Sequence, residues 1–162
     1  VFLGAPDRYD WKLVGKQEMI VPYNAYRVTY AADANKLLTA NHMEPSSVRW
    51  EKHRVWVVEA TLKEGARHIY HKRRFYLDED TWIALASDQY DARGQLYRGA
   101  FAFLSQSYDQ QVPDATPYVN YDLIGGSYSV SGLTGPYGGI KYSKPLSNAQ
   151  WSSESLAGAG IR

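Results

Sequence analysis

The fold of this protein is decided by residues 48–104, which read VRWEKHRVWVVEATL (48–62), RHIYHKRRFYL (67–77), TWIALASDQY (81–90) and QLYRGAFAFL (95–104), with short connections between them. The three connections, residues 63–66, 78–80 and 91–94, are rich in Gly, Asp and Glu. A strand and a turn that recur at a spacing of roughly ten residues are typical of an antiparallel meander. We therefore predict four consecutive strands, each paired with the next.

The first hairpin of this meander has Glu64-Gly65 at its centre. Glycine supplies the positive φ that a two-residue hairpin loop requires. With such a loop, the two strands pair so that Glu59 faces Tyr70 and His53 faces Tyr76.

The remaining sequence predicts further strands and one short helix. We expect an entry loop over residues 1–15, strands over 17–21, 25–30, 119–123 and 127–133, a helix over 31–40 and a loop over 41–47. Eight of the 13 glycines fall within residues 125–162. The prediction is therefore a mostly-β fold: a curved antiparallel β domain over residues 1–134, followed by a Gly/Ser-rich, irregular C-terminal tail over residues 135–162.

Charge and composition exclude several classes of function. The 162 residues carry a net charge of +1 and no cysteine, so thiol chemistry and disulfides are absent. Residues 48–77 hold eight basic and three acidic residues, but residues 78–91 hold five acidic residues and no basic one. Alternation along a strand also places Arg73 on the face opposite Lys72 and Arg74. We therefore expect no nucleic-acid binding.

The polar residues predict neither a metal site nor an active site. His68 and His71 are three residues apart, so on a strand they point to opposite faces, and only His53 can pair readily with a residue across from it. The Asp78-Glu79-Asp80 run is interpreted as a polar turn. The sequence has no nucleophile elbow and no phosphate-binding loop. We expect no metal, no cofactor and no enzymatic activity, and an activity that depended on His53 or Glu59 would overturn this.

The aromatic residues are the strongest candidates for function. An ordinary core beneath the sheet would account for any single one of them. As a set, they predict a concave apolar lining for an elongated hydrophobic ligand. The predicted lining comprises Trp50, Trp56, Val58, Leu62, Tyr76, Trp82, Phe101 and Phe103. Arg54, Arg73 and Arg74 are predicted to form a basic rim for an anionic head group.

Several long motifs carry a resemblance to a known family. HRVWVVEATL (53–62), RHIYHKRRFYLDEDTW (67–82), DQYDARGQLYR (88–98) and the upstream residues 6–27 resemble an uncharacterised family of Gram-negative periplasmic proteins, which is similar to the outer-membrane lipoprotein-sorting proteins of the LolA/LolB class. The resemblance extends over residues 6–130. It implies a half-open antiparallel barrel whose apolar cavity shields acyl chains, in the periplasm.

The resemblance also implies partners and a missing part. Members of the family are longer, and this chain resembles their C-terminal half; it begins at Val1 and shows no signal peptide. We therefore expect a non-enzymatic carrier for a lipid or acylated ligand, working beside a hydrophobic-substrate exporter or an outer-membrane component. Its own N-terminal half is a further expected partner. The alternative is an accessory interaction subunit that docks on another chain through exposed strand edges and the Tyr-rich tail.

Overall fold

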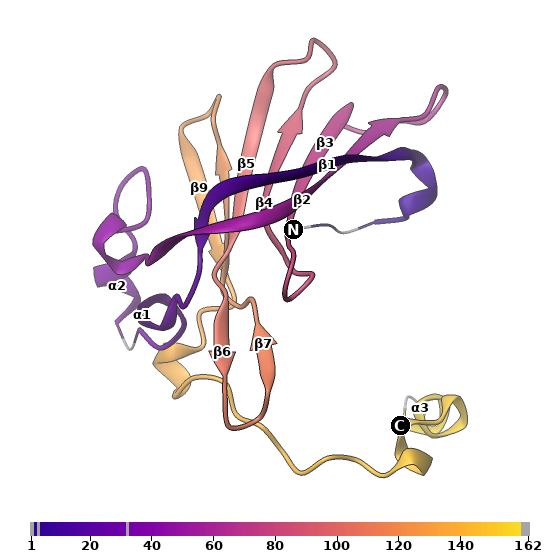
Figure 1. Ribbon diagram of the computed structural model, residues 1–162. Coiled ribbons are helices and arrows are strands. Elements are labelled where there is room, and N and C mark those ends of the chain that lie inside the picture. The colour runs from indigo at the N-terminus through magenta and orange to yellow at the C-terminus, as the bar shows by residue number, and fades with distance from the viewer. Residues whose placement is uncertain (1, 3, 32, 160–162) are drawn as a thin grey trace.

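The computed structural model describes residues 2, 4–31 and 33–159. Seven strands form one curved antiparallel sheet in the order β1-β2-β3-β4-β5-β8-β9, and β6 pairs with β7 in a separate ribbon (Figure 1). The strands are β1 Tyr9–Pro22, β2 Trp50–Leu62, β3 Lys72–Asp78, β4 Ala84–Tyr90, β5 Leu96–Ala102, β6 Ser105–Ser107, β7 Val112–Asp114, β8 Tyr118–Asp122 and β9 Ser127–Ser131. Because β2 to β5 follow one another across the sheet, the predicted meander is confirmed.

The helices are all short. They are α1 Tyr26–Thr29, α2 Ala34–Leu37 and α3 Ser153–Ala159, with 3-10 turns η1 Pro6–Arg8, η2 Pro45–Ser47, η3 Gly135–Tyr137 and η4 Asn148–Trp151. Helix α1 occupies the segment 25–30, for which a strand was predicted, so that prediction is wrong. The β-branched Val28 and Thr29 favour a strand locally, but both are fully buried against the rest of the fold. The Tyr26 hydroxyl also donates to the Gln106 carbonyl at 2.8 Å, so tertiary contacts hold the helical turn.

The edge strand β1 is much longer than predicted. It pairs with β2 from Tyr9↔Leu62 to Pro22↔Trp50, with one irregularity between Leu13 and Gly15, so residues 9–15 do not form an entry loop. Most side chains of β1 are exposed, and the strand therefore lacks the apolar alternation that reveals a strand in sequence.

The register between β2 and β3 differs from the prediction by four residues. Glu59 faces Arg74 instead of Tyr70, and Val57 faces Tyr76 instead of His53. Residues 63–71 form a longer loop in place of the two-residue turn, and the Tyr9 hydroxyl donates a hydrogen bond to the Tyr70 carbonyl of this loop at 3.1 Å. A shift of four residues is even, so the assignment of side chains to faces survives.

Residues paired across the sheet share a face, which defines two rows. One row contains Val57, Tyr76, Ala86, Phe101, Val119 and Val130. Val119 and Phe101 of this row pack with Val28 of α1 and Leu37 of α2, so we call this the helix-covered face. The opposite, open face carries Val58, Phe75, Ser87, Ala100, Asn120 and Ser129.

The C-terminal segment departs from the sheet after β9. The Thr134 hydroxyl donates to the Thr29 carbonyl at 3.2 Å, and Gly135 lies against the Ala31 backbone where a side chain would not fit. The extended stretch beyond η3 leads to η4 and α3 (Figure 1). Among the described residues, no helix combines the length and apolar character needed to span a membrane.

The observed register predicts that Glu59 stabilises the fold through Arg74. Their side chains pair at 2.7 Å, and this hydrogen bond lowers the pKa of Glu59. A carboxylate with a lowered folded-state pKa contributes stability above its unfolded pKa of about 4.3, and that contribution is lost as the pH falls through the folded-state pKa. We expect Glu59→Gln to lower the free energy of unfolding by about 1 kcal/mol at neutral pH, and by much less at an acidic pH below the folded-state pKa of Glu59.

Urea denaturation at the two pH values measures this difference. Glu18→Gln is the matched control, because Glu18 pairs with Lys52 at an exposed position. It should change the stability by less than about 0.5 kcal/mol. An equal loss at both pH values for Glu59→Gln would contradict the pairing.

Candidate functional site

The structure brings three of the predicted lining residues together. Trp50, Phe101 and Phe103 line a pocket of about 160 Å³. The other lining residues are His42, Met43, Pro45, Val48 and Tyr121. The rings of Trp50 and Phe101 meet edge to face, with centroids 5.3 Å apart. The pocket is therefore walled mainly by apolar and aromatic groups from β2, β5 and the segment between α2 and β2.

The other predicted lining residues lie elsewhere. Trp56 stacks on Trp82 at 6.1 Å beside the turn between β3 and β4. Leu62 packs on the open face with Tyr9, Ala60 and Phe75, and the register places Val58 on that face too. Tyr76 is buried in the core, where burial and then its hydrogen bond to Asp88 raise its pKa. The eight residues therefore do not form one continuous lining.

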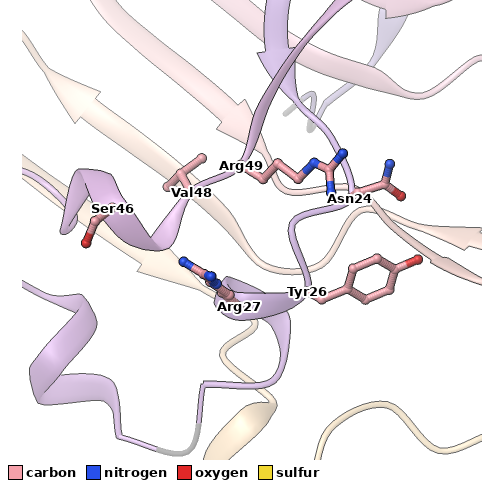
Figure 2. Close-up of a pocket in the computed structure, with 6 residues that line it drawn as sticks. All are labelled: Asn24, Tyr26, Arg27, Ser46, Val48 and Arg49. Atoms are coloured by element: carbon pink, nitrogen blue, oxygen red, sulfur yellow. The ribbon is translucent and has the colours of Figure 1, made fainter.

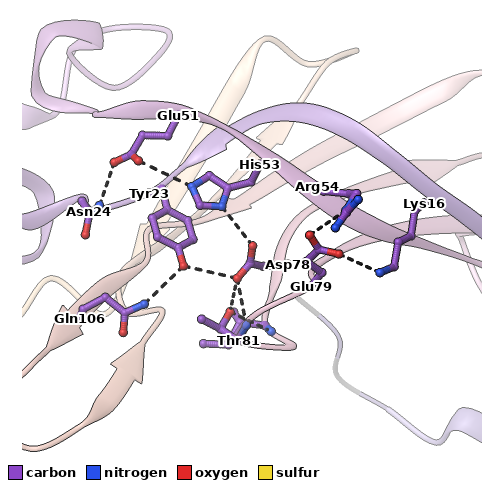
Figure 3. Close-up of polar contacts among 11 residues, drawn as sticks. Lys16, Tyr23, Asn24, Glu51, His53, Arg54, Asp78, Glu79, Thr81 and Gln106 are labelled. Atoms are coloured by element: carbon purple, nitrogen blue, oxygen red, sulfur yellow. Dashed lines mark hydrogen bonds and ion pairs between the residues drawn. The ribbon is translucent and has the colours of Figure 1, made fainter.

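The predicted basic rim is also dispersed. Arg54 and Lys16 both pair with Glu79 at 2.7 Å (Figure 3), and Arg74 is engaged with Glu59. The charges of Arg54 and Arg74, which were predicted to contact a head group, are thus paired with Glu79 and Glu59.

Arg73 has a different environment, because it is buried on the open face. Its guanidinium lies 4.6 Å from the Phe2 ring centroid, 5.1 Å from that of Phe75 and 5.3 Å from that of Tyr70. Burial lowers the pKa of Arg73, but an arginine remains protonated. Arg73 also lines a pocket of about 420 Å³ with Phe2, His68, Tyr70, Gln89, Tyr118, Asn120 and Ser131. That lining is largely polar and does not match an acyl chain.

Two arginines that the sequence did not single out define a cationic pocket. The pocket has a volume of about 420 Å³ and is lined by Asn24, Tyr26, Arg27, Ser46, Val48 and Arg49. Figure 2 shows Arg27 reaching it from α1 and Arg49 reaching it from the segment that enters β2. Arg49 pairs with Glu51 at 2.8 Å, whereas Arg27 has no ion-pair partner among the described residues.

Local hydrogen bonds hold the walls of this cationic pocket. The Glu44 carboxylate accepts hydrogen bonds from the backbone N–H and the hydroxyl of Ser46, which lower the pKa of Glu44 and cap η2. Asn24 adopts a left-handed backbone conformation with φ 50°, and its side-chain amide donates to Glu51 at 2.9 Å. Asparagine tolerates this conformation better than most residues, which positions the bend between β1 and α1.

The cationic and apolar pockets are neighbours. Val48 lines both, and the two adjoining residues Pro45 and Ser46 line one pocket each. An apolar pocket beside a cationic one is suited chemically to a molecule with a hydrocarbon part and an anionic part. The sequence patterns do not single out Arg27, because its position in the pocket depends on the helical conformation of residues 26–29, which tertiary contacts determine.

Comparison with known proteins places the chain in a family. The sequence matches the family described as a protein of unknown function (DUF1329) over residues 1–157. The chain belongs to this family. It is 49% identical over 134 residues to an uncharacterized protein of Pseudomonas aeruginosa, a match that covers 82% of this chain and 30% of the relative. The chain thus spans about a third of that relative's length, and the predicted family is confirmed.

Two solved structures are similar in fold to this DUF1329 chain. A DUF1329 family protein from Desulfovibrio piger has 19% identity and a TM-score of 0.49, and the match covers 93% of this chain and 48% of that one. A Vibrio parahaemolyticus structure, named provisionally as an outer membrane lipoprotein-sorting protein domain, has 13% identity, a TM-score of 0.46 and the same coverage.

Proposed function

We propose that this DUF1329 chain is a non-enzymatic carrier domain that binds an anionic amphiphile. The hydrocarbon part would occupy the apolar pocket of Trp50, Phe101 and Phe103, and the anionic group would meet Arg27 and Arg49. The observation that carries the proposal is that the apolar and cationic pockets share Val48.

Burial of hydrocarbon supplies the driving force in this proposal. Each buried CH₂ contributes about 0.8 kcal/mol, without any directional contact. Ligand pockets generally measure roughly 300–1,000 Å³, so the apolar pocket of about 160 Å³ holds only part of a long acyl chain. The adjoining cationic pocket provides the space for the rest of the ligand and its head group.

The arginines supply recognition rather than most of the affinity. A guanidinium forms paired hydrogen bonds with a carboxylate or phosphate. Arg27 is available for such a contact, whereas Arg49 must share its charge with Glu51. The proposal includes a location in the periplasm and transfer of the ligand to an exporter or outer-membrane component, both of which rest on the family resemblance of the motifs at residues 53–98.

The first test concerns the apolar pocket. We expect the full chain to bind a fluorescent hexadecanoic acid, and Trp50→Ala to weaken the binding about tenfold, which corresponds to the burial of about two CH₂ groups. Trp82→Ala is the matched control, because Trp82 is an exposed tryptophan that stacks on Trp56 outside the pocket. Fluorescence titration measures the affinities. No binding by the wild type, or an equal loss in both variants, would contradict the proposal.

The second test concerns the cationic pocket. Arg27→Gln should lower the affinity for hexadecanoate several-fold and leave the affinity for hexadecanol unchanged, because only the former carries a charge for the guanidinium. Competition against the fluorescent probe measures both ligands. Arg67→Gln, in the exposed loop 63–71, should change neither. Equal losses for the acid and the alcohol would argue against a head-group role for Arg27.

A second candidate function is an interaction module, favoured by the outer edge of β1. Trp11, Leu13, Val14 and Ile20 on this strand are 42–60% exposed. Among the described residues β1 pairs only with β2, so its other edge has free backbone groups, and such an edge promotes association.

Size-exclusion chromatography with light scattering distinguishes the two functions. For an interaction module we expect the chain to elute above its 18.4 kDa monomer mass, and Val14→Lys to restore the monomer by charging the edge. A wild-type monomer that binds the fluorescent acid would support the carrier instead.

A further inference from the structure

A cluster of potential metal ligands lies at the turn between β3 and β4, outside the pockets described above. His53 on β2, Asp78 at the end of β3 and Asp80 in the turn each offer one ligand atom, and these three atoms lie within 4.8 Å of one another. The sequence interpretation separated these residues, because it treated 78–80 as a simple polar turn. In the observed register Asp78 lies opposite Val55, and the turn that follows Asp78 therefore lies beside His53.

The buried carboxylate of Asp78 has one oxygen directed at this cluster. Its Oδ2 accepts hydrogen bonds from the Thr81 backbone N–H at 3.0 Å and the Thr81 hydroxyl at 2.8 Å, with the Tyr23 hydroxyl at 3.5 Å (Figure 3). Its Oδ1 is buried and accepts no hydrogen bond from the described residues. It faces His53 Nδ1 at 3.4 Å instead. Burying a carboxylate oxygen without a hydrogen-bond partner costs free energy, and a bound cation would offset that cost.

We propose that His53, Asp78 and Asp80 bind one zinc-type divalent cation. Zinc binds a histidine nitrogen at about 2.0–2.1 Å and a carboxylate oxygen at about 2.0–2.2 Å, so two ligands of a tetrahedral zinc lie about 3.4 Å apart. The separation of His53 Nδ1 and Asp78 Oδ1 matches that spacing. Asp80 is exposed, so it supplies a third ligand from the solvent side and leaves the fourth position for water.

The surroundings orient His53 as a ligand. With Nδ1 toward the cation, the other ring nitrogen, Nε2, lies 3.6 Å from the Glu51 carboxylate. Metal-bound histidines commonly donate their second N–H to a carboxylate, and Glu51 is the carboxylate near enough to take that role with a small movement. The ring also stacks on Tyr23, with centroids 3.7 Å apart and an interplanar angle of 18°, which holds its plane (Figure 3).

Glu51 is itself held in place by the residues around it. Its carboxylate accepts a hydrogen bond from the Asn24 side-chain amide at 2.9 Å and pairs with Arg49 at 2.8 Å. Glu79, between the two aspartates, pairs with Arg54 and Lys16 and takes no part in the cluster. The site therefore has three close ligands, one second-layer carboxylate and a stacked ring, and its role is to fasten the turn between β3 and β4 to β2.

Titration calorimetry of the full chain with ZnCl₂, after treatment with a chelator and buffer exchange, tests the site. We expect one zinc per chain, and a loss of affinity of at least tenfold in His53→Gln and in Asp80→Asn. Because Asp80 is exposed, the second variant should fold like the wild type, which circular dichroism verifies. His71→Gln and Asp109→Asn, both at exposed positions away from the cluster, are the controls and should bind as the wild type does.

Thermal unfolding gives an independent readout. Zinc should raise the Tm of the wild type and of both controls, and should leave the Tm of Asp80→Asn nearly unchanged. The absence of saturable binding by the wild type would leave only the direct contact between His53 and Asp78. Equal affinities in the wild type, His53→Gln and Asp80→Asn would place bound zinc elsewhere. Either result would overturn the proposal.

Discussion

The register between β2 and β3 is the constraint on which the rest of the structure depends. Strand β2 has 13 residues and β3 has seven, and their pairing begins at Val55↔Asp78. The first five residues of β2, Trp50 to Arg54, therefore extend beyond the end of β3. Among the described residues they pair in the sheet with β1 alone, and the Glu79 N–H of the turn after β3 donates to the Arg54 carbonyl at 3.2 Å. Their side chains can contact that turn and the segment before β2. Trp50 of the apolar pocket and His53 of the proposed metal site both lie on this overhang.

Glu51 connects the two candidate sites physically. Its carboxylate lies between Asn24 and Arg49, which line the cationic pocket, and His53, which belongs to the proposed metal site. A cation at His53 would strengthen the pull on Glu51 and so alter how firmly Arg49 is held. One carboxylate thus contacts residues of both sites, and in the proposed carrier a ligand at either site would bias the charge distribution at the other.

Local sequence patterns predict well those features that depend on local chemistry. The turn at residues 91–94 is closed by Gly94 with φ 76°, and Asp91 accepts hydrogen bonds from the backbone N–H groups of Arg93 and Gln95, as a type I turn with these residues predicts. Strands β8 and β9 lie within a residue or two of their predicted bounds. The opposite orientation of Arg73 and Arg74 follows from alternation alone, and the structure confirms it.

Long-range contacts decide the features that the sequence patterns missed. The first loop is longer than two residues and is contacted from β1 by the hydrogen bond of Tyr9 to the Tyr70 carbonyl, and in the resulting register His53 lies beside Asp78 rather than opposite Tyr76. In the same way, burial of Val28 against the sheet converts a strand-like segment into α1 and delivers Arg27 to the pocket. For the site, aromatic content predicted Trp50 and Phe101, which line the apolar pocket, but the position of the cations beside them depends on packing between distant segments.

The apolar pocket, at about 160 Å³, is too small for a whole long acyl chain, so part of its wall must move if the proposed carrier is to bind one. One of its walls is the segment between α2 and β2, which is held by the Leu38↔Met43 bridge, the Glu44 cap on η2, the buried Met43 side chain and the hydrogen bond from the Tyr128 hydroxyl to the Thr39 carbonyl. Segments outside the core strands generally open at a lower free energy than those strands do. In the proposed carrier, a long acyl chain would enter by displacing this segment while the sheet stays intact. The affinity of the proposed carrier would then equal the free energy gained by burying CH₂ groups minus the free energy lost when the contacts of Met43 and Glu44 break. Such a balance would let the carrier hold a ligand and still release it.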